Sequence, residues 1–153
     1  MMGFNDGIPE YGINHLLWPN EIAQKMWPFL RGMIDSMLVD GMGYVIEGEA
    51  MLPQLIADLV EEHPDKIRVV FVGYTEINVT DKVALVKKHG DGENDWLTGQ
   101  SDEYIMDHIG NMIAYSKMIK KECERHGLSY FDTSKDFLGA IEAATDFLLG
   151  DLN

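Results

Sequence analysis

Apolar residues recur every three to four positions in several long stretches of the chain, a spacing that predicts amphipathic helices. The first such stretch begins with Asn20 as an N-cap and ends at Gly41, with a kink expected at Pro28. Helical spacing returns in residues 52–60, 80–88, 101–127 and 134–150. Serine, threonine or glycine at the ends of most of these stretches supports the boundaries.

Three short β-rich runs lie between the helical stretches: Tyr44–Ile46, Ile67–Gly73 and Leu128–Phe131. The second is apolar with little alternation, which is typical of a strand covered on both faces. Strand and helix alternate after Tyr44, so we predict an α/β fold with a three-layer parallel sheet flanked by helices. We expect residues 1–153 to form a single domain and residues 1–18, which show no sustained period, to form a loop or arm.

Charge and cysteine content narrow the function classes. The formal charge is -14, and basic residues never gather into a patch with aromatic residues, so nucleic acid is not an expected partner. No apolar run is long enough to span a membrane, and the first residues show no basic region followed by an apolar one, so we do not expect export. The single cysteine, Cys123, is expected to be a buried structural thiol, and we predict a cytoplasmic location.

Two glutamates follow the first predicted strand. Glu47 and Glu49 stand two residues apart, a spacing that can aim both carboxylates in one direction and hold Mg²⁺ directly or through water. The alternative is that both are solvated and favour the positive N-terminus of the next helix. These residues are the candidate metal ligands.

Polar residues also follow the other two predicted strands. Tyr74 and Thr75 come after the second strand, and Asp132, Thr133 and Ser134 come after the third. Because ligands in open parallel sheets bind beyond the carboxyl ends of the strands, we expect all of these ends to line one cleft. The alternative for Asp132, Thr133 and Ser134 is a simple helix cap, with ligand contact as an additional role.

A polar segment rich in glycine joins two of the predicted helices and follows two lysines, Lys87 and Lys88. Its residues Asn94, Asp95 and Trp96 are candidates for substrate binding. Cationic side chains next to such a loop suit a lid that closes on phosphates, although a solvated helix face explains the lysines equally well.

Several of these segments resemble a known family. The run Gly43–Pro53 (GYVIEGEAMLP) is similar to the "VIEG…LP" strand and turn of P-loop kinases related to the adenylate, shikimate and zeta-toxin-like group. The similarity continues in order through Phe71–Tyr74, Asn94–Trp96 with Ser101–Glu103, and Lys121–Ser134. It covers nearly the whole chain and is strongest to uncharacterised bacterial members of the group.

The resemblance implies a nucleotide- and small-molecule-kinase fold with ATP and Mg²⁺ as cofactors. In such a kinase, Glu47 or Glu49 would lie near Mg²⁺ and the phosphoryl acceptor and would serve catalysis. Residues 88–96 would form a lid, and Asp132, Thr133 and Ser134 would border the adenine.

One family feature is missing. The sequence nowhere contains G-x-x-x-x-G-K-[ST], whose backbone N–H groups cradle phosphates, and no strand and helix precede the first predicted helix to carry it. We therefore expect an incomplete P-loop fold, in which Met1 is an internal methionine of a longer kinase. Because the absent strand would lie mid-sheet, we expect the flanking strands either to pair directly or to dimerise through exposed edges.

Two functions follow as hypotheses. The first is a truncated or remnant ATP-dependent phosphotransferase with little or no turnover as it stands. The alternative is a non-catalytic domain that binds a metabolite or another protein on a kinase-like scaffold.

Overall fold

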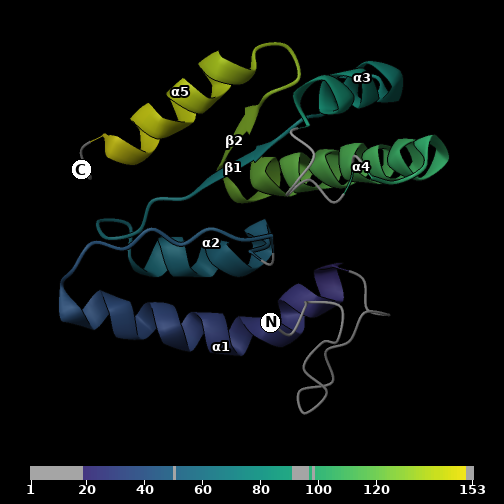
Figure 1. The fold of residues 1–153 in the computed structure, drawn as a ribbon. Coiled ribbons are helices and arrows are strands. Elements are labelled where there is room, and N and C mark those ends of the chain that lie inside the picture. Colours follow the sequence, from purple (N-terminus) through teal and green to yellow (C-terminus); the bar gives the residue numbers. More distant parts are fainter. Residues whose placement is uncertain (1–18, 50, 91–96, 98, 151–153) are drawn as a thin grey trace. The chain divides into compact units, whose positions relative to one another are not determined.

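The computed structural model describes residues 19–49, 51–90, 97 and 99–150, and the chain divides into two compact units (Figure 1). Unit 1 comprises Met1–Ile67 with Leu152–Asn153, and unit 2 comprises Arg68–Asp151. The predicted arm, residues 1–18, lies outside the described residues. The expectation of a single domain stays a prediction.

The described residues of unit 1 form two helices. Helix α1 spans Pro19–Asp40 and continues through Pro28, so it begins before Asn20, the predicted N-cap. Gly41 follows the helix with a φ of 72°, as the sequence predicted. Helix α2 spans Pro53–Glu62 and begins at a proline, whose missing N–H suits the first helical position. Arg31 of α1 donates hydrogen bonds to both Asp35 and Glu62, and the second bond ties α1 to α2.

In unit 2, the part of the chain that the structure describes forms three helices and two strands, arranged β1–α3–α4–β2–α5. Strand β1 spans Val70–Gly73, α3 spans Val79–His89, α4 spans Asp102–His126, β2 spans Ser129–Asp132 and α5 spans Phe137–Leu149. The predicted Ser101 cap accepts a hydrogen bond from the N–H of Tyr104, and Gly127 ends α4 in the left-handed region. Helices α3 and α4 enclose a core of buried aliphatic side chains, namely Val83, Leu97, Ile105, Ile109 and Ile113.

The two strands pair in parallel, with Val70 opposite Ser129 and Gly73 opposite Asp132. Phe131 packs edge-on against Phe147 of α5 at 6.0 Å, while the neighbouring Tyr130 lies under Lys120 of α4 at 5.9 Å. Because successive side chains of a strand point to opposite faces, α4 and α5 cover opposite faces of the pair. Figure 1 shows the strands between these two helices.

The predicted fold class is wrong. Helices dominate the described residues and the sheet has two strands, so the chain does not form a three-layer parallel sheet of the P-loop type. Strand Ile67–Gly73 is shortened to β1, and Tyr44–Ile46 forms no strand at all. Residues 41–48 have no regular secondary structure, and within them the Met42 N–H and the Tyr44 hydroxyl donate hydrogen bonds to the nearby Asp40 carboxylate.

The predicted direct pairing of Tyr44–Ile46 with Ile67–Gly73 is also not formed. In the described part of the chain, β1 pairs with β2 instead.

No helix among the described residues is long and apolar enough to cross a membrane.

Candidate functional site

The carboxyl ends of β1 and β2 bring five of the predicted site residues into one polar cluster. Tyr74 and Thr75 follow β1, and Asp132, Thr133 and Ser134 end or follow β2. The parallel pairing places these two ends side by side, as expected for two of the three predicted strand ends. Thr133 fixes the alignment, because its N–H and hydroxyl donate to the Gly73 carbonyl at 2.8 and 3.0 Å.

Asp132 is the centre of this cluster. Its Oδ1 accepts hydrogen bonds from the backbone N–H of Thr75 at 3.3 Å, from the Ser134 N–H at 3.0 Å and from the Ser134 hydroxyl. Its Oδ2 accepts from the Thr75 hydroxyl and lies 3.4 Å from the Lys120 ammonium. Both carboxylate oxygens are therefore occupied by groups of the chain itself.

The hydrogen bonds decide the charge of Asp132. Desolvation by itself would raise the pKa of this carboxyl, but the side chains and backbone N–H groups of Ser134 and Thr75 outweigh it. The net effect is a pKa well below the usual range of an aspartate. Asp132 is therefore ionised at neutral pH and acts as an acceptor, not as a general acid or base.

The Ser134 hydroxyl is also occupied by hydrogen bonds within the chain. Its hydroxyl donates to Asp132 and accepts from the backbone N–H groups of Thr75 and Glu76, each at 2.8 Å. A hydroxyl with this set of partners has no base positioned to activate it as a nucleophile. The geometry is that of a clasp, in which one carboxylate and one hydroxyl hold the loop after β1 to the loop after β2.

Tyr74 packs into the core side of the cluster. Its ring lies 4.0 Å below the Lys82 ammonium and its hydroxyl donates to Met112 Sδ at 3.3 Å. Burial raises the pKa of Tyr74 and lowers that of Lys82. These contacts give Tyr74 a packing role in unit 2.

Helix α4 contributes side chains that the sequence reasoning did not assign to the site. Ser116 Oγ accepts from the Tyr74 N–H at 3.4 Å, and Lys120, one turn further, reaches Asp132. Burial, the largest cause, raises the pKa of Tyr130 to about 12, although the nearby Ser116 hydroxyl opposes the shift. The four-residue spacing of Ser116 and Lys120, which puts both on one side of a helix, was the available signal.

The remaining predicted site residues lie elsewhere. Glu47 and Glu49 are exposed in the irregular segment of unit 1, and Lys88 is exposed near the end of α3. Lys87 forms an ion pair with Asp102 at the start of α4 at 2.5 Å. The candidate substrate-binding residues Asn94, Asp95 and Trp96 lie outside the described residues, as does most of the predicted lid.

The polar cluster does not fit magnesium. A divalent cation needs several oxygen ligands with free lone pairs, whereas both oxygens of Asp132 already accept protein donors and Lys120 adds a positive charge. Within the ranges that the structure describes, no three His, Cys, Asp or Glu side chains are grouped to hold a metal ion. No chemical step through Mg²⁺ can be derived from this cluster.

In comparisons with known proteins, no family model, curated protein or solved structure matches this chain.

Proposed function

We propose that this chain is a non-catalytic interaction domain in which the two-stranded sheet of unit 2 pairs with the same sheet of a second copy. The observation that carries the proposal is the exposure of the strands. No residue of β1 or β2 is buried, and Val72 is 46% exposed. Parallel strands with helices on both faces are ordinarily buried. Because these two strands are not buried, we infer that the flanking helices could cover a wider sheet than the two strands form.

The outer edge of β1 is suited to pairing. The strand consists of Val70, Phe71, Val72 and Gly73, without the charge, proline or bulge that usually protects an edge. The Gly73 carbonyl faces β2, where it accepts from Thr133. Backbone groups of neighbouring residues point to opposite sides of a strand, so the N–H and C=O of Val72 point outward.

Helix α5 supports the same proposal. Phe137, Ile141 and Leu148 share the side of the helix that carries the buried Ala144, yet all three are exposed. An apolar face that is turned toward a sheet but left uncovered indicates that further sheet is expected beneath it. Symmetric pairing of two β1 edges is antiparallel and widens the sheet under α5.

The experiment is sedimentation equilibrium of the full chain at several protein concentrations. We expect a reversible dimer, and Val72→Pro removes the outward donor and raises the dimer dissociation constant about tenfold or more, the effect of losing a central interface contact. Val45→Pro, at an exposed residue outside both strands, is the matched control. Val72→Lys tests the same edge without a proline, and far-UV circular dichroism checks that each variant is folded.

The result that contradicts the proposal is a monomer at every concentration, or a dimer that both Val72 variants leave unchanged. High salt should strengthen the dimer, because each copy carries a net charge of -14.

A second candidate is the phosphotransferase remnant, for which the family resemblance implies ATP and Mg²⁺, although the polar cluster itself does not fit Mg²⁺. One observation favours it: hydroxyls and the Lys120 ammonium gather at the carboxyl ends of parallel strands, where nucleotides bind in many α/β proteins. Calorimetric titration of Mg-ATP into the chain, with Mg-ADP for comparison, tests it. Saturable heat would support this candidate, and no heat at millimolar nucleotide would remove it.

We further propose a cytoplasmic location and no role in nucleic-acid binding. Both rest on composition, namely the lone buried Cys123 and the strongly acidic sequence.

A further inference from the structure

One flank of helix α5 is apolar and exposed. The α5 flank, as we call it, consists of Phe137, Ile141 and Leu148, which are between 36% and 60% exposed. Their spacing of four and seven residues places the three side chains along one line of the helix. The two acidic residues of α5, Glu142 and Asp146, are rotated away from this line by about 100° or more. The α5 flank is therefore an uncharged apolar surface.

The α5 flank faces the side of the sheet on which β1 has its outer edge. On the other flank of the same helix, Phe147 packs edge-on against Phe131 of β2. Because α5 contacts both strands and leans on β2 through Phe147, the opposite flank lies on the β1 side. Val72 of β1 is the neighbour of Phe131 in the parallel register, so it points to the same face as Phe131. Its exposure shows that α5 leaves this side of the face uncovered.

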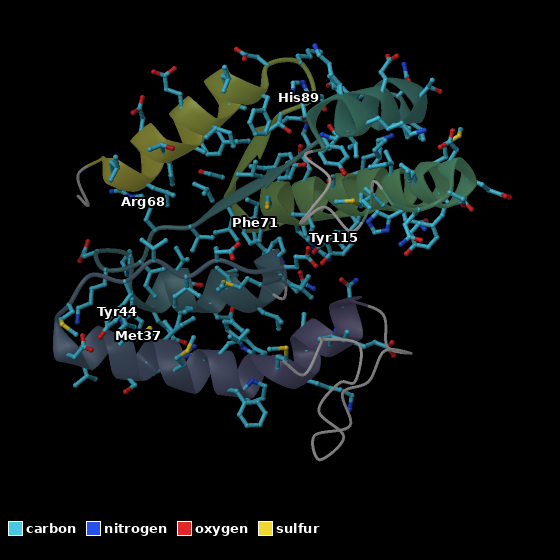
Figure 2. All side chains as sticks on the ribbon, in the orientation of Figure 1. Met37, Tyr44, Arg68, Phe71, His89 and Tyr115 are labelled. Atoms are coloured by element: carbon cyan, nitrogen blue, oxygen red, sulfur yellow. The ribbon has the colours of Figure 1, made fainter. Side chains whose placement is uncertain are left out.

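Arg68 fixes the level of α5 along the strands. It stands just before β1 and donates to backbone carbonyls at the C-terminal end of α5, including those of Leu148 at 3.4 Å and Gly150. Figure 2 shows Arg68 beside this end of the helix. From Arg68, the middle of β1 at Phe71 is about 10 Å further along the strand. The same distance spans about seven residues of a helix, which leads from Leu148 back to Ile141. Ile141 is therefore level with the middle of β1.

Pairing of two β1 edges, the proposed function on which this inference rests, fixes where the second α5 lies. The twofold axis of an antiparallel strand pair stands perpendicular to the sheet, so the two α5 helices cover the same face. Each copy contributes two strands, so the helices lie two strand spacings apart, or about 10 Å. Helices in contact have their axes about 8–10 Å apart. The two α5 flanks are therefore within packing distance of each other.

We propose that the α5 helices of the two copies pack against each other across this axis, with Ile141 at the centre of the contact. The outward backbone groups of β1 belong to Val70 and Val72, so the axis passes beside Phe71, which lies between them. Because Ile141 belongs to the α5 flank and is level with Phe71, the two Ile141 side chains face each other. The partner is thus a second copy of this chain, joined by a helix pair as well as by a strand pair.

Disulfide formation tests this contact directly. Ile141→Cys places a thiol from each copy at the axis, and Cys123, the single cysteine of the chain, is fully buried and does not compete. With diamide as the oxidant, the full chain carrying this change should form a disulfide-linked dimer on a non-reducing gel. Asp146→Cys, at an exposed position on another side of α5, is the matched control and should remain monomeric on the gel.

Ile141→Asp provides a second measurement, in which no covalent bond is made. It should raise the dimer dissociation constant in sedimentation equilibrium about tenfold or more, because it places two carboxylates at the centre of the contact. Leu85→Asp, at an exposed leucine of α3, is the matched control and should dimerise as the wild type does. Circular dichroism checks that each variant is folded.

The outcomes separate the helix contact from the strand pairing. A wild-type chain that stays monomeric at every concentration overturns both. If the wild type is a dimer that the Val72 variants weaken, the strand pairing stands. The helix contact is then overturned if Ile141→Cys forms no more disulfide than Asp146→Cys, or if Ile141→Asp leaves the dissociation constant unchanged.

Discussion

Thr75 donates both its backbone N–H and its side-chain hydroxyl to the carboxylate of Asp132. The two residues stand 57 positions apart in the sequence, and Thr75 is almost fully buried. These two hydrogen bonds to one carboxylate join the loops that follow β1 and β2. The clasp therefore makes the stability of unit 2 depend on the ionisation of a single carboxyl group.

Asp132→Asn should lower the free energy of unfolding at pH 7 by about 1–3 kcal/mol, because an ionised acceptor is lost and polar groups are left poorly paired. The pKa of Asp132 is lowered in the folded chain, so its contribution is complete above the unfolded pKa of about 4 and is lost as pH falls through the folded pKa. The difference between wild type and variant should therefore narrow as pH is lowered below about 4.

Urea unfolding followed by circular dichroism at several pH values measures this difference. Asp58→Asn removes an exposed carboxylate of α2 and should follow the wild-type curve. A difference between wild type and Asp132→Asn that stays constant down to low pH would show that the carboxylate charge is not what stabilises the clasp.

Gly73→Ala tests the close approach of β1 to its neighbours. A methyl group at this position would collide with the Tyr130 hydroxyl and lie 2.8 Å from Ser116 Oγ. We expect a loss of about 1–3 kcal/mol in the free energy of unfolding, as for overpacking elsewhere. Adding Tyr130→Phe should recover part of the loss, because the first obstacle is removed. Gly43→Ala, where a methyl group meets nothing within 4 Å, should be neutral.

Cys123 should be unreactive in the folded chain. The thiol is completely buried, and burial, followed by the charges of Glu124 and Glu122, raises its pKa to about 12. Reaction with Ellman's reagent at pH 8 should be slow in buffer and fast in concentrated urea, because only unfolding exposes the thiol and restores its ordinary ionisation. Fast reaction without urea would contradict the packing of α4 against the sheet.

Alanine in place of Gly110, inside α4, and of Gly127, just after it, should change the free energy of unfolding in opposite directions. Gly127 has a φ of 66°, so Gly127→Ala should cost about 1 kcal/mol in the free energy of unfolding. Gly110 lies inside the same helix with only an ordinary contact to Val79, so Gly110→Ala should stabilise by about 0.5–1 kcal/mol. Thermal melts of both variants compare the two effects, and the same sign for both would contradict the assigned helix end.

The sequence predicts the helices well because their signals are local. Ser101 and Gly127 bound α4 as expected, since a side-chain cap and a left-handed glycine act within one turn. The start of α5 was misjudged: Ser134 was expected to open it, but Asp136 caps it through the Gly139 N–H. The Ser134 hydroxyl instead accepts hydrogen bonds from the backbone N–H groups of Thr75 and Glu76. The local sequence pattern does not reveal such long-range partners.

Sheet width was the main error. Tyr44, Val45 and Ile46 have the right composition for a strand, but a strand forms only where a neighbour supplies hydrogen bonds. Val45 is instead 95% exposed. For the candidate site, the rule for parallel strand ends placed Thr75 beside Asp132, and the two are hydrogen-bonded. Their predicted role in binding a ligand stays a prediction. The rule missed Lys120, whose contact with Asp132 depends on how α4 is rotated against the sheet.

The crossover from β1 to β2 also sets the order in which unit 2 is made. Thr133 bonds to Gly73 across 60 residues of chain, so the strands can meet only after α3 and α4 have been synthesised. Closing such a long loop is an entropic barrier that local helix formation does not share. On the ribosome, β1 leaves the exit tunnel long before its partner exists, and during that interval its uncharged edge is open to chaperones and to other nascent chains.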